Sequence, residues 1–333
     1  MGLALGPQPV PRVIRLVLRR LAAAAVLFLI VLTLTFAAVA GAPGDPLSPN
    51  DPRIPAEHAE RLRALYGLDQ PLPAQYLRWL GAVLLSWDWG QSYQTGRPVS
   101  DLLFEALPPT LLLAGAALFA QYLFGIGLGL IAARRPNSWL DLGVRAASLL
   151  VYALPTFWVG LMAVLIVGVG LGLAPTGGMT SAAAYEFGPL AAVLDVLAHL
   201  WLPALVLGLS MAGDIARYTR SSLIEFQTTD AGRAAKARGL PWTRILLVHG
   251  LAHAAPRLLQ MAAVSAPLLL SGAIVAEAVF VWPGLGSTTL RAIQAGDVPV
   301  VLAATAYGAA LVIAASLAAD LLLVRLDPRI QAE

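Results

Sequence analysis

The amino-acid sequence predicts an all-α integral membrane protein with six transmembrane helices and with both termini in the cytoplasm. Three observations lead to this prediction. First, 58% of the 333 residues are hydrophobic and only 12% are charged, whereas about a quarter of the residues of a soluble domain are charged. Second, six apolar runs are each long enough to cross a bilayer core of about 30 Å as a helix. Third, Lys and Arg are concentrated in alternate connections between these runs, as the positive-inside rule requires.

The six apolar runs are bounded by charged or polar residues and have no charge at their centres. Backbone polar groups in lipid must be satisfied within the segment, so we expect each run to be a helix. The predicted spans are residues 21–40, 106–133, 146–173, 196–213, 258–276 and 298–319. Residues 38–40 (AVA) resemble a signal-peptidase site. The apolar run before them is longer than a typical signal core, so we expect the first helix to be retained.

The basic residues fix the expected orientation. With the N-terminus placed inside, the cytoplasmic segments hold sixteen of the 22 Lys and Arg residues and the opposite side holds six. Residues 134–145 and 217–257 are therefore expected to be cytoplasmic, together with both termini. The net charge of +3 then reflects topology and does not indicate a nucleic-acid partner.

These spans divide the chain into parts with different expected locations. The parts are residues 1–40 (cytoplasmic N-terminus and first helix), 41–105 (extracytoplasmic segment), 106–325 (five-helix core with the cytoplasmic loop 217–257) and 326–333 (cytoplasmic tail). The extracytoplasmic segment is rich in aromatic residues, which predicts a belt at the lipid headgroup level. These residues are Tyr76, Trp79, Trp87, Trp89 and Tyr93. Glycines of FGIGLGL (124–130) and VGVGLGL (167–173) lie inside apolar runs, which predicts close helix contacts and not a phosphate-binding loop.

The stretch EFQTTDAGRAAKARGLPWTRILLVHG, residues 225–250, contains the only lysine of the chain. Asp230 is predicted to cap a helix of about eight residues that begins at Ala231. Gly239 is predicted to close this helix in the left-handed conformation, and Pro241 prevents its continuation. A helix of this length is marginal in water, so we expect it to pack against another element. The residues that follow are amphipathic and lead into the fifth span.

The predicted short helix has two distinct faces. Ala231, Ala234 and Ala235 form a thin face, and Arg233 and Lys236 form a basic one. Such a rod is suited to a groove on a partner protein. The alternative is a basic loop that only sets topology or contacts anionic lipid.

Several short motifs occur in a fixed order along nearly the whole chain. They are GAPGDP, YGLDQPLPAQYLRWL, GRPVSDLL, LPTFWVGL, ARYTRSSL, EAVFVWPGLG, DVPVV and LDPRI. Together with Ala234-Ala235, Gly239 and Pro256 in the basic loop, they resemble the permease subunits of binding-protein-dependent ABC importers, in the branch that handles dipeptides, oligopeptides and nickel. Arg233 stands where the wider superfamily has a glutamate, so we assign it no glutamate-like contact.

The resemblance implies a type I, MetI-like architecture that forms half of the translocation pathway for a peptide-like solute, most simply a di- or oligopeptide. It also implies a bacterial inner membrane and four further subunits, namely a second homologous permease, two cytoplasmic ATPase subunits and an extracytoplasmic solute-binding protein. The signature helix would dock in a groove of an ATPase. The implied ATPase-coupling residues are Asp230, Arg233, Ala234, Ala235, Lys236, Gly239 and Leu240.

The sequence contains no phosphate-binding loop of its own. Such a loop needs Gly-Lys-Ser/Thr, and Lys236 lies between Ala235 and Ala237. We therefore expect a non-catalytic chain without cofactor or metal, with ATP and Mg bound by the partner subunits. A membrane-embedded enzyme is also disfavoured, since HExxH, GxSxG and paired acids within a span are missing from the sequence.

An ion-coupled secondary transporter is the alternative function. Such proteins place ionisable groups within their spans, whereas the span centres here are uncharged. Asp195 and His199 have the spacing of a metal-binding pair, but two ligands do not make a site. Asp214 is expected to pair with Arg217 on one helical face.

Glu277 and Trp282 flank the predicted turn at Pro283-Gly284, after the fifth span. They are candidates for an external gate or for a contact with the binding protein. An interfacial tryptophan beside a turn is the alternative.

Overall fold

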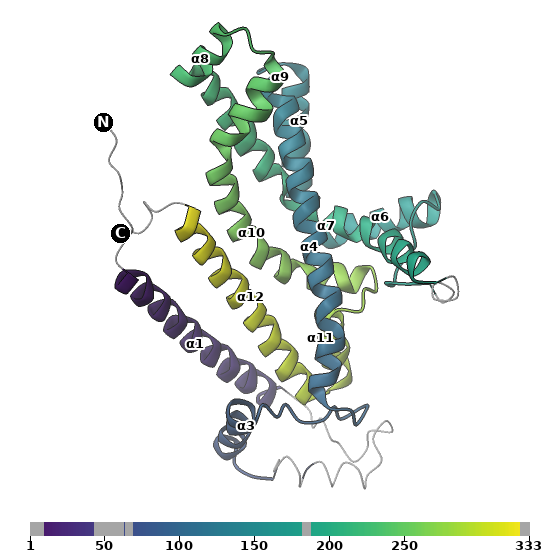
Figure 1. Ribbon diagram of the computed structural model, residues 1–333. Coiled ribbons are helices and arrows are strands. Elements are labelled where there is room, and N and C mark those ends of the chain that lie inside the picture. Colours follow the sequence, from purple (N-terminus) through teal and green to yellow (C-terminus); the bar gives the residue numbers. More distant parts are fainter. Residues whose placement is uncertain (1–9, 43–62, 64–68, 182–187, 327–333) are drawn as a thin grey trace. The chain divides into compact units, whose positions relative to one another are not determined.

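The computed structural model describes residues 10–42, 63, 69–181 and 188–326 (Figure 1). Much of the predicted extracytoplasmic segment, residues 43–62 and 64–68, lies outside these ranges. The chain forms two compact units, the first comprising residues 1–103 and 291–317, and the second comprising residues 104–290 and 318–333. Within the described residues nearly all regular structure is helical, and the only β pairing is the isolated bridge between Gln91 and Pro98.

Five helices of the described residues are long and apolar enough to cross a membrane, and a sixth span results if one bent helix pair is counted as a single span. The five are residues 18–40, 99–134, 189–228, 242–279 and 298–319. They contain the first, second, fourth, fifth and sixth predicted spans. The all-α membrane fold predicted from the sequence is therefore confirmed.

The third predicted span, residues 146–173, is not a continuous helix. Helix α5 (Trp139–Ala153) ends before Pro155, and the following pair, α6 (Thr156–Ala163) and the π-helix η1 (Val164–Gly170), runs at 102° to it. Leu154 adopts an extended backbone, with φ −87° and ψ 137°. The ring of a proline disfavours the helical conformation for the residue before it, and this explains the break.

The first unit contains α1 (Val10–Ala40), α3 (Leu72–Ser86) and most of α12 (Val298–Leu326). The ring of Phe36 on α1 lies 5.3 Å from Tyr76 and 5.5 Å from Trp79, both on α3. The hydroxyls of Thr33 and Tyr76 are 2.7 Å apart. Helix α3 is thus joined to α1 by an aromatic cluster.

The predicted aromatic belt of the first unit is only partly exposed. Trp89 and Tyr93 are each 4% exposed, and the Trp89 ring lies 5.4 Å from that of Tyr307 on α12. The buried carboxylate of Asp297 accepts hydrogen bonds from the Ser92 hydroxyl at 2.5 Å and from the Tyr93 amide at 3.1 Å. These contacts fold the loop after α3 inward, so two of the five rings serve as core.

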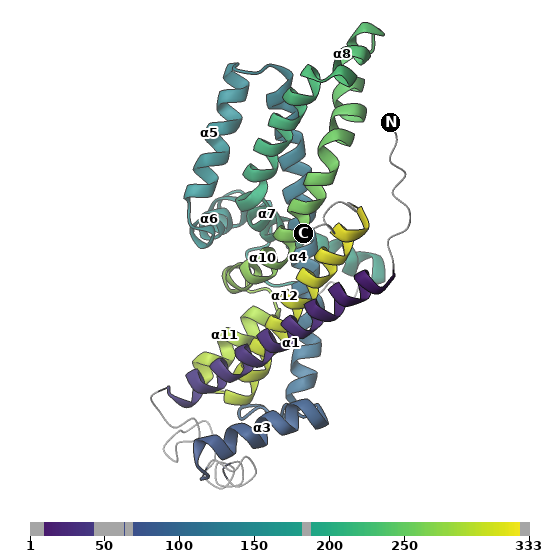
Figure 2. The same ribbon diagram turned by 90° about the vertical axis from the view of Figure 1, so that its left-hand side faces the viewer.

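The second unit is a bundle built around three long helices, which Figures 1 and 2 show running beside one another. They are α4 (Val99–Arg134), α7 (Pro189–Thr228) and α10 (Leu251–Val279). The shorter elements that follow α7 are α8 (Asp230–Ala237), α9 (Trp242–Arg244) and the π-helix η3 (Ile245–Gly250), and α11 (Leu285–Ala295) follows α10.

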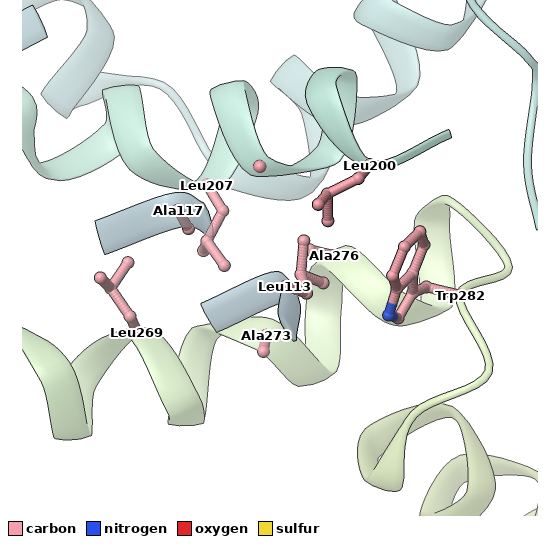
Figure 3. Packing of buried hydrophobic residues seen from close by; sticks show 9 residues of the cluster. Leu113, Ala117, Leu200, Leu207, Leu269, Ala273, Ala276 and Trp282 are labelled. Carbon is pink, nitrogen blue, oxygen red and sulfur yellow. The ribbon is translucent and has the colours of Figure 1, made fainter. Parts of the chain in front are cut away.

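The core of this bundle is made by side chains from all three long helices (Figure 3). Leu113 of α4, Leu207 of α7 and Leu269 of α10 are each at most 2% exposed. The helices approach closely at glycines, as predicted for the FGIGLGL run. A Cβ atom on Gly125 would lie 2.5 Å from the Cβ of Ile215 on α7. Two carbon atoms cannot pack at this distance, so only glycine fits here.

Candidate functional site

Helix α8 is an eight-residue helix that lies at one end of the second unit, beyond the ends of α7 and α10 (Figure 1). Its N-cap is Thr229, whose hydroxyl oxygen accepts a hydrogen bond from the Gly232 amide at 3.1 Å. The predicted cap at Asp230 is therefore wrong by one residue. Thr229 has the extended backbone that a cap requires, and Asp230 is already helical. The carboxylate of Asp230 still lies in the first turn, where the helix dipole favours it, and it pairs with Arg233.

The C-terminal end of α8 agrees with the sequence prediction. Gly239 has φ +72°, in the left-handed region, and its amide donates to the Lys236 carbonyl at 2.9 Å. The amide of Leu240 donates to the Ala235 carbonyl at 3.4 Å. Pro241 then precedes α9 as its N-cap. The chain therefore turns sharply between the short helix and the long helical segment that follows.

One face of α8 is fixed against its own chain. Gly232 and Ala235 are buried, and Ala235 belongs to a core cluster with Ala133, Leu223, Phe226, Ile245 and Leu246. A Cβ atom on Gly232 would overlap the carbonyl oxygen of Phe226. The predicted thin face of three alanines is thus only partly correct, since Ala235 faces inward while Ala231 and Ala234 are exposed. The backbone of Phe226 and Gln227 lies directly against Gly232, so only the side of α8 that carries its smallest residue can pack this closely.

The opposite side of α8 is exposed and carries small and cationic residues. Its exposed residues include Arg233, Ala234, Lys236, Ala237 and Arg238. The Arg233 side chain is 69% exposed even though it pairs with Asp230. This surface presents positive charge around a small, low-relief centre.

The loop that contains α8 is also held from the side of α4. The guanidinium of Arg134, the last residue of α4, lies 5.7 Å from the centre of the Trp242 ring, a cation–π contact. Ala133 contributes to the same core cluster as Ala235. Helix α8 therefore rests on α7, on the end of α4 and on the beginning of the segment that leads to α10.

Residues 242–279 form one helical segment of 38 residues that includes the π-helix η3. Gly250 ends η3, and a Cβ atom there would lie 2.6 Å from the Leu223 Cδ2 atom. The close approach holds this segment against α7 directly beneath α8. The arrangement agrees with the prediction that a short helix is joined to a spanning helix.

An ion pair that the sequence reasoning missed lies near α8. Arg220 of α7 donates through Nε and Nη2 to the two carboxylate oxygens of Asp141, at 2.6 Å each. The Asp141 side chain is fully buried, and that of Arg220 is 19% exposed. The two residues are 79 positions apart in the sequence, so no local pattern could have paired them. The ARYTRSSL motif contains Arg220 and was the only available signal.

Glu277 and Trp282 lie at the other end of α10 from α8, and both side chains are fully buried. The Glu277 carboxylate accepts hydrogen bonds from the Thr110 hydroxyl at 2.6 Å and from the Ser287 amide at 3.0 Å. The Trp282 indole N–H donates to the Pro109 carbonyl at 2.9 Å. Trp282 packs in the core of Figure 3 with Leu113 and Ala276. Both side chains are thus enclosed by the subunit itself, and buried donors from α4 and α11 satisfy the carboxylate. Their role at an external gate or in a contact with the binding protein stays a prediction.

The remaining charged residues near the ends of the predicted spans form local contacts. Asp214 and Arg217 form an ion pair, as predicted. The Asp195 carboxylate accepts hydrogen bonds from the amide and the hydroxyl of Ser181, each at 2.6 Å, and the backbone carbonyl of Asp195 lies 2.8 Å from His199 Nδ1. Within the described residues no group of three or more His, Cys, Asp or Glu side chains is placed to hold a metal ion.

Comparison with known proteins identifies the sequence as similar to membrane components of transport systems. Residues 125–332 match the family described as "Binding-protein-dependent transport system inner membrane component", and residues 13–114 match the N-terminal region of such membrane components. The oligopeptide transport system permease protein AppB of Bacillus subtilis is 36% identical over 300 residues, which cover 90% of this chain and 93% of AppB. The di/tripeptide transport system permease protein DppB of Pseudomonas aeruginosa is 36% identical over 330 residues, covering 94% and 97%. A putative peptide permease protein of Brucella suis is 38% identical over 294 residues, covering 87% and 90%.

Proposed function

The chain belongs to the family of binding-protein-dependent transport system inner membrane components, and from this premise we propose that it forms half of a peptide translocation pathway. Membership makes it a non-catalytic, multi-pass permease subunit of an ABC importer in the inner membrane, with an ATPase and a binding protein supplied by other polypeptides. The proposal adds a second homologous permease subunit, and two ATPase subunits that bind ATP and Mg.

The proposed cargo is a di- or oligopeptide. Its support is the similarity to AppB and DppB, whose names refer to oligopeptides and to di- and tripeptides. The test is to copurify the solute-binding protein that assembles with this chain and to identify its ligand by mass spectrometry. A bound peptide supports the assignment, and a bound sugar or nickel chelate would overturn it.

The proposed orientation places α8 and both termini in the cytoplasm. It is supported by the distribution of basic residues, sixteen of which lie on the side of α8. It implies that residues 41–105 are extracytoplasmic. The chain has no native cysteine, so a single cysteine at Ser48 can be labelled selectively in intact cells. Labelling from the outer side supports the orientation, and labelling only from the cytoplasm would contradict it.

The proposed role of α8 is to dock in a groove of an ATPase subunit. The observation that supports it is a short helix with one face fixed on its own chain and the other face exposed, basic and small. This helix lies between two long membrane helices, α7 and the segment 242–279. A displacement of α8 by a partner would act on both of them. The proposed coupling residues remain Asp230, Arg233, Ala234, Ala235, Lys236, Gly239 and Leu240.

Ala234→Trp is the sharper of two substitutions that test docking. Ala234 is exposed, so a tryptophan there is accommodated by the subunit itself and obstructs only a partner. Ala235 is buried against Phe226 and Ile245, so the same substitution there would disrupt the subunit. We expect Ala234→Trp to abolish uptake by the assembled importer, and Ala234→Ser, which keeps the small volume, to preserve it. Uptake at the wild-type rate by Ala234→Trp would contradict docking.

Glu277 and Trp282 have a proposed role that differs from a direct gate contact. Because both are fully buried, we propose that they brace the turn between α10 and α11 and so shape the external end of the pathway indirectly. In a reconstituted importer, Trp282→Phe should then change the rate of uptake while leaving the affinity for the solute-binding protein unchanged. A large loss of that affinity would indicate a direct contact instead.

The energy source of the proposed importer lies outside this chain. Purified alone, the chain is expected to hydrolyse no ATP and to accumulate no solute. Robust hydrolysis without partners would overturn the assignment as a permease subunit. Accumulation driven by an ion gradient would favour the secondary transporter.

A further inference from the structure

The Asp141–Arg220 pair is a charged contact between two helices of the second unit, α5 and α7. Both Arg220 donors reach a carboxylate oxygen at 2.6 Å, which is the two-pronged geometry of the strongest arginine–carboxylate pairs. Arg145 adds a third charged contact, with its Nε 3.4 Å from Asp141 Oδ1. Neither the proposed docking of α8 nor the membrane packing accounts for this pair, since neither residue belongs to α8 or to the apolar core.

Asp141 is held in place by its own helix end as well as by Arg220. It occupies the first turn of α5, where Ser138 is the N-cap and accepts from the Asp141 amide at 3.3 Å. Its Oδ2 atom accepts from the Asn137 amide at 2.8 Å. Asn137 has φ +62°, in the left-handed region that asparagine tolerates. The turn between α4 and α5 is thus closed around the carboxylate, so a force on Asp141 acts on the ends of both helices.

Arg220 lies close to the core cluster on which α8 packs. It lies on α7 before Leu223 and Phe226, the two α7 residues in the core cluster that includes Ala235 of α8. The same cluster contains Ala133 of α4, one residue before the Arg134 that contacts the Trp242 ring. A displacement of α8 is therefore passed directly to the end of α7. The Asp141–Arg220 pair is the polar connection from that end to α5.

We propose that Asp141 and Arg220 are positioning residues that make the end of α7 and the α4–α5 turn move as one body when a partner displaces α8. This inference rests on the proposed docking of α8. A buried pair of opposite charges suits the role because separating the partners leaves an uncompensated buried charge, which is strongly unfavourable. Without the pair, the partner would continue to hydrolyse ATP, but a smaller fraction of the hydrolysis events would open the pathway.

The experiment measures solute taken up per ATP hydrolysed by the complete importer in proteoliposomes. Arg220→Lys retains the positive charge but cannot form both hydrogen bonds at once. We expect the uptake per ATP to fall by roughly two- to thirty-fold, with copurification of the ATPase and its rate of hydrolysis unchanged. The matched control is Arg217→Lys, one turn earlier on α7, whose pair with Asp214 is 47% exposed on both sides. This control is expected to keep the wild-type ratio.

A second variant separates transmission from folding. Because the chain contains no cysteine, Asp141→Cys combined with Arg220→Cys can be bridged specifically with a short bifunctional thiol reagent. We expect the unbridged double variant to show the low ratio, and the bridged one to recover uptake per ATP toward the wild-type value. A role in folding alone predicts no recovery, since the bridge is added after assembly.

Two results would overturn the inference. One is a wild-type ratio in both Arg220→Lys and the unbridged double variant. The other is a low ratio that bridging does not raise. Failure of the proposed function itself would look different, because the wild-type chain would then copurify with no ATPase and no ratio would be defined.

Discussion

Replacing Gly232 by alanine tests whether the inner face of α8 is held as closely as the structure indicates. A Cβ atom at this position would overlap the Phe226 carbonyl oxygen and would lie 3.0 Å from the Gln227 Cα atom. Both are backbone atoms, so no change of side-chain rotamer can relieve the overlap. Helix α8 would have to move away from α7, and this would open the core cluster around Ala235.

The magnitude of the Gly232→Ala effect follows from two opposing terms. Overpacking a well-packed contact costs about 1–3 kcal/mol. Alanine also favours a helix over glycine by about 1 kcal/mol at most. The expected net destabilisation of the packed α8 is therefore up to about 2 kcal/mol, which corresponds to a change of up to roughly 30-fold in the population of the packed state. Gly143→Ala on α5 is the matched control, because nothing lies within 4 Å of a Cβ atom at that exposed position.

Hydrogen exchange of the backbone amides of α8 is the direct assay, with uptake per ATP as the functional one. In the Gly232→Ala variant we expect faster exchange at residues 232–240 and weaker coupling, while the Gly143→Ala variant retains both wild-type values. Wild-type exchange in the Gly232→Ala variant would show that the close approach to Phe226 is not a constraint. The reasoning about the support of α8 would then fail, even if the family assignment stood.

Three further substitutions have expected effects on stability or local order. Gly239→Ala should lower the thermal stability of the loop by about 1 kcal/mol, because alanine disfavours the φ of +72° at this position. No neighbouring atom would contact the added Cβ, so the effect comes from the backbone alone. Gly239→Asn should lower the stability less, because asparagine tolerates the left-handed region. Asp297→Asn should raise the protease sensitivity of the loop that follows α3, since an amide in place of the carboxylate weakens the hydrogen bond from the Ser92 hydroxyl. Trp282→Phe should lower the midpoint of thermal unfolding, because it removes the indole hydrogen bond to the buried Pro109 carbonyl and with it about 0.5–1.5 kcal/mol of the free energy of unfolding. An unchanged midpoint would show that water replaces the indole.

The spans of this protein could be predicted from the sequence because lipid imposes a simple rule on composition. An uncharged run of about 20 residues has few alternatives to a membrane helix, and five of the six predicted runs fall within long helices. The break at Leu154 was missed because hydropathy averages over a window and ignores a single proline. The length of α7 was missed for a related reason. It continues through polar residues to Thr228, where hydropathy no longer marks a helix.

The sequence predicted the local features of α8, but it did not predict which face of this helix is buried. The left-handed Gly239 and the length of α8 follow from rules about neighbouring residues. The inward face does not, because α8 has small residues on every side. Gly232 and Ala235 are buried because of contacts with the end of α7 and with the core cluster around Phe226, Ile245 and Leu246. Contacts between residues distant in the sequence, such as Asp141 with Arg220, depend on how the helices assemble, and no pattern of neighbouring residues predicts them.

The polar contacts of the second unit are distributed in a way that suits a moving gate. A charge pair, Asp141 with Arg220, lies near α8, and the Glu277 carboxylate is enclosed at the opposite end of α10. Between them the helices meet mainly through apolar and small residues, with the hydrogen bond from Gln121 to Ser265 at 3.1 Å among the few polar links. Such a neutral link within a membrane contributes only about 0.6 kcal/mol on average. Strong contacts thus fix the helix ends, while weak contacts between them allow the helices to tilt. We therefore expect transport to involve rigid helix ends and a central region that repacks.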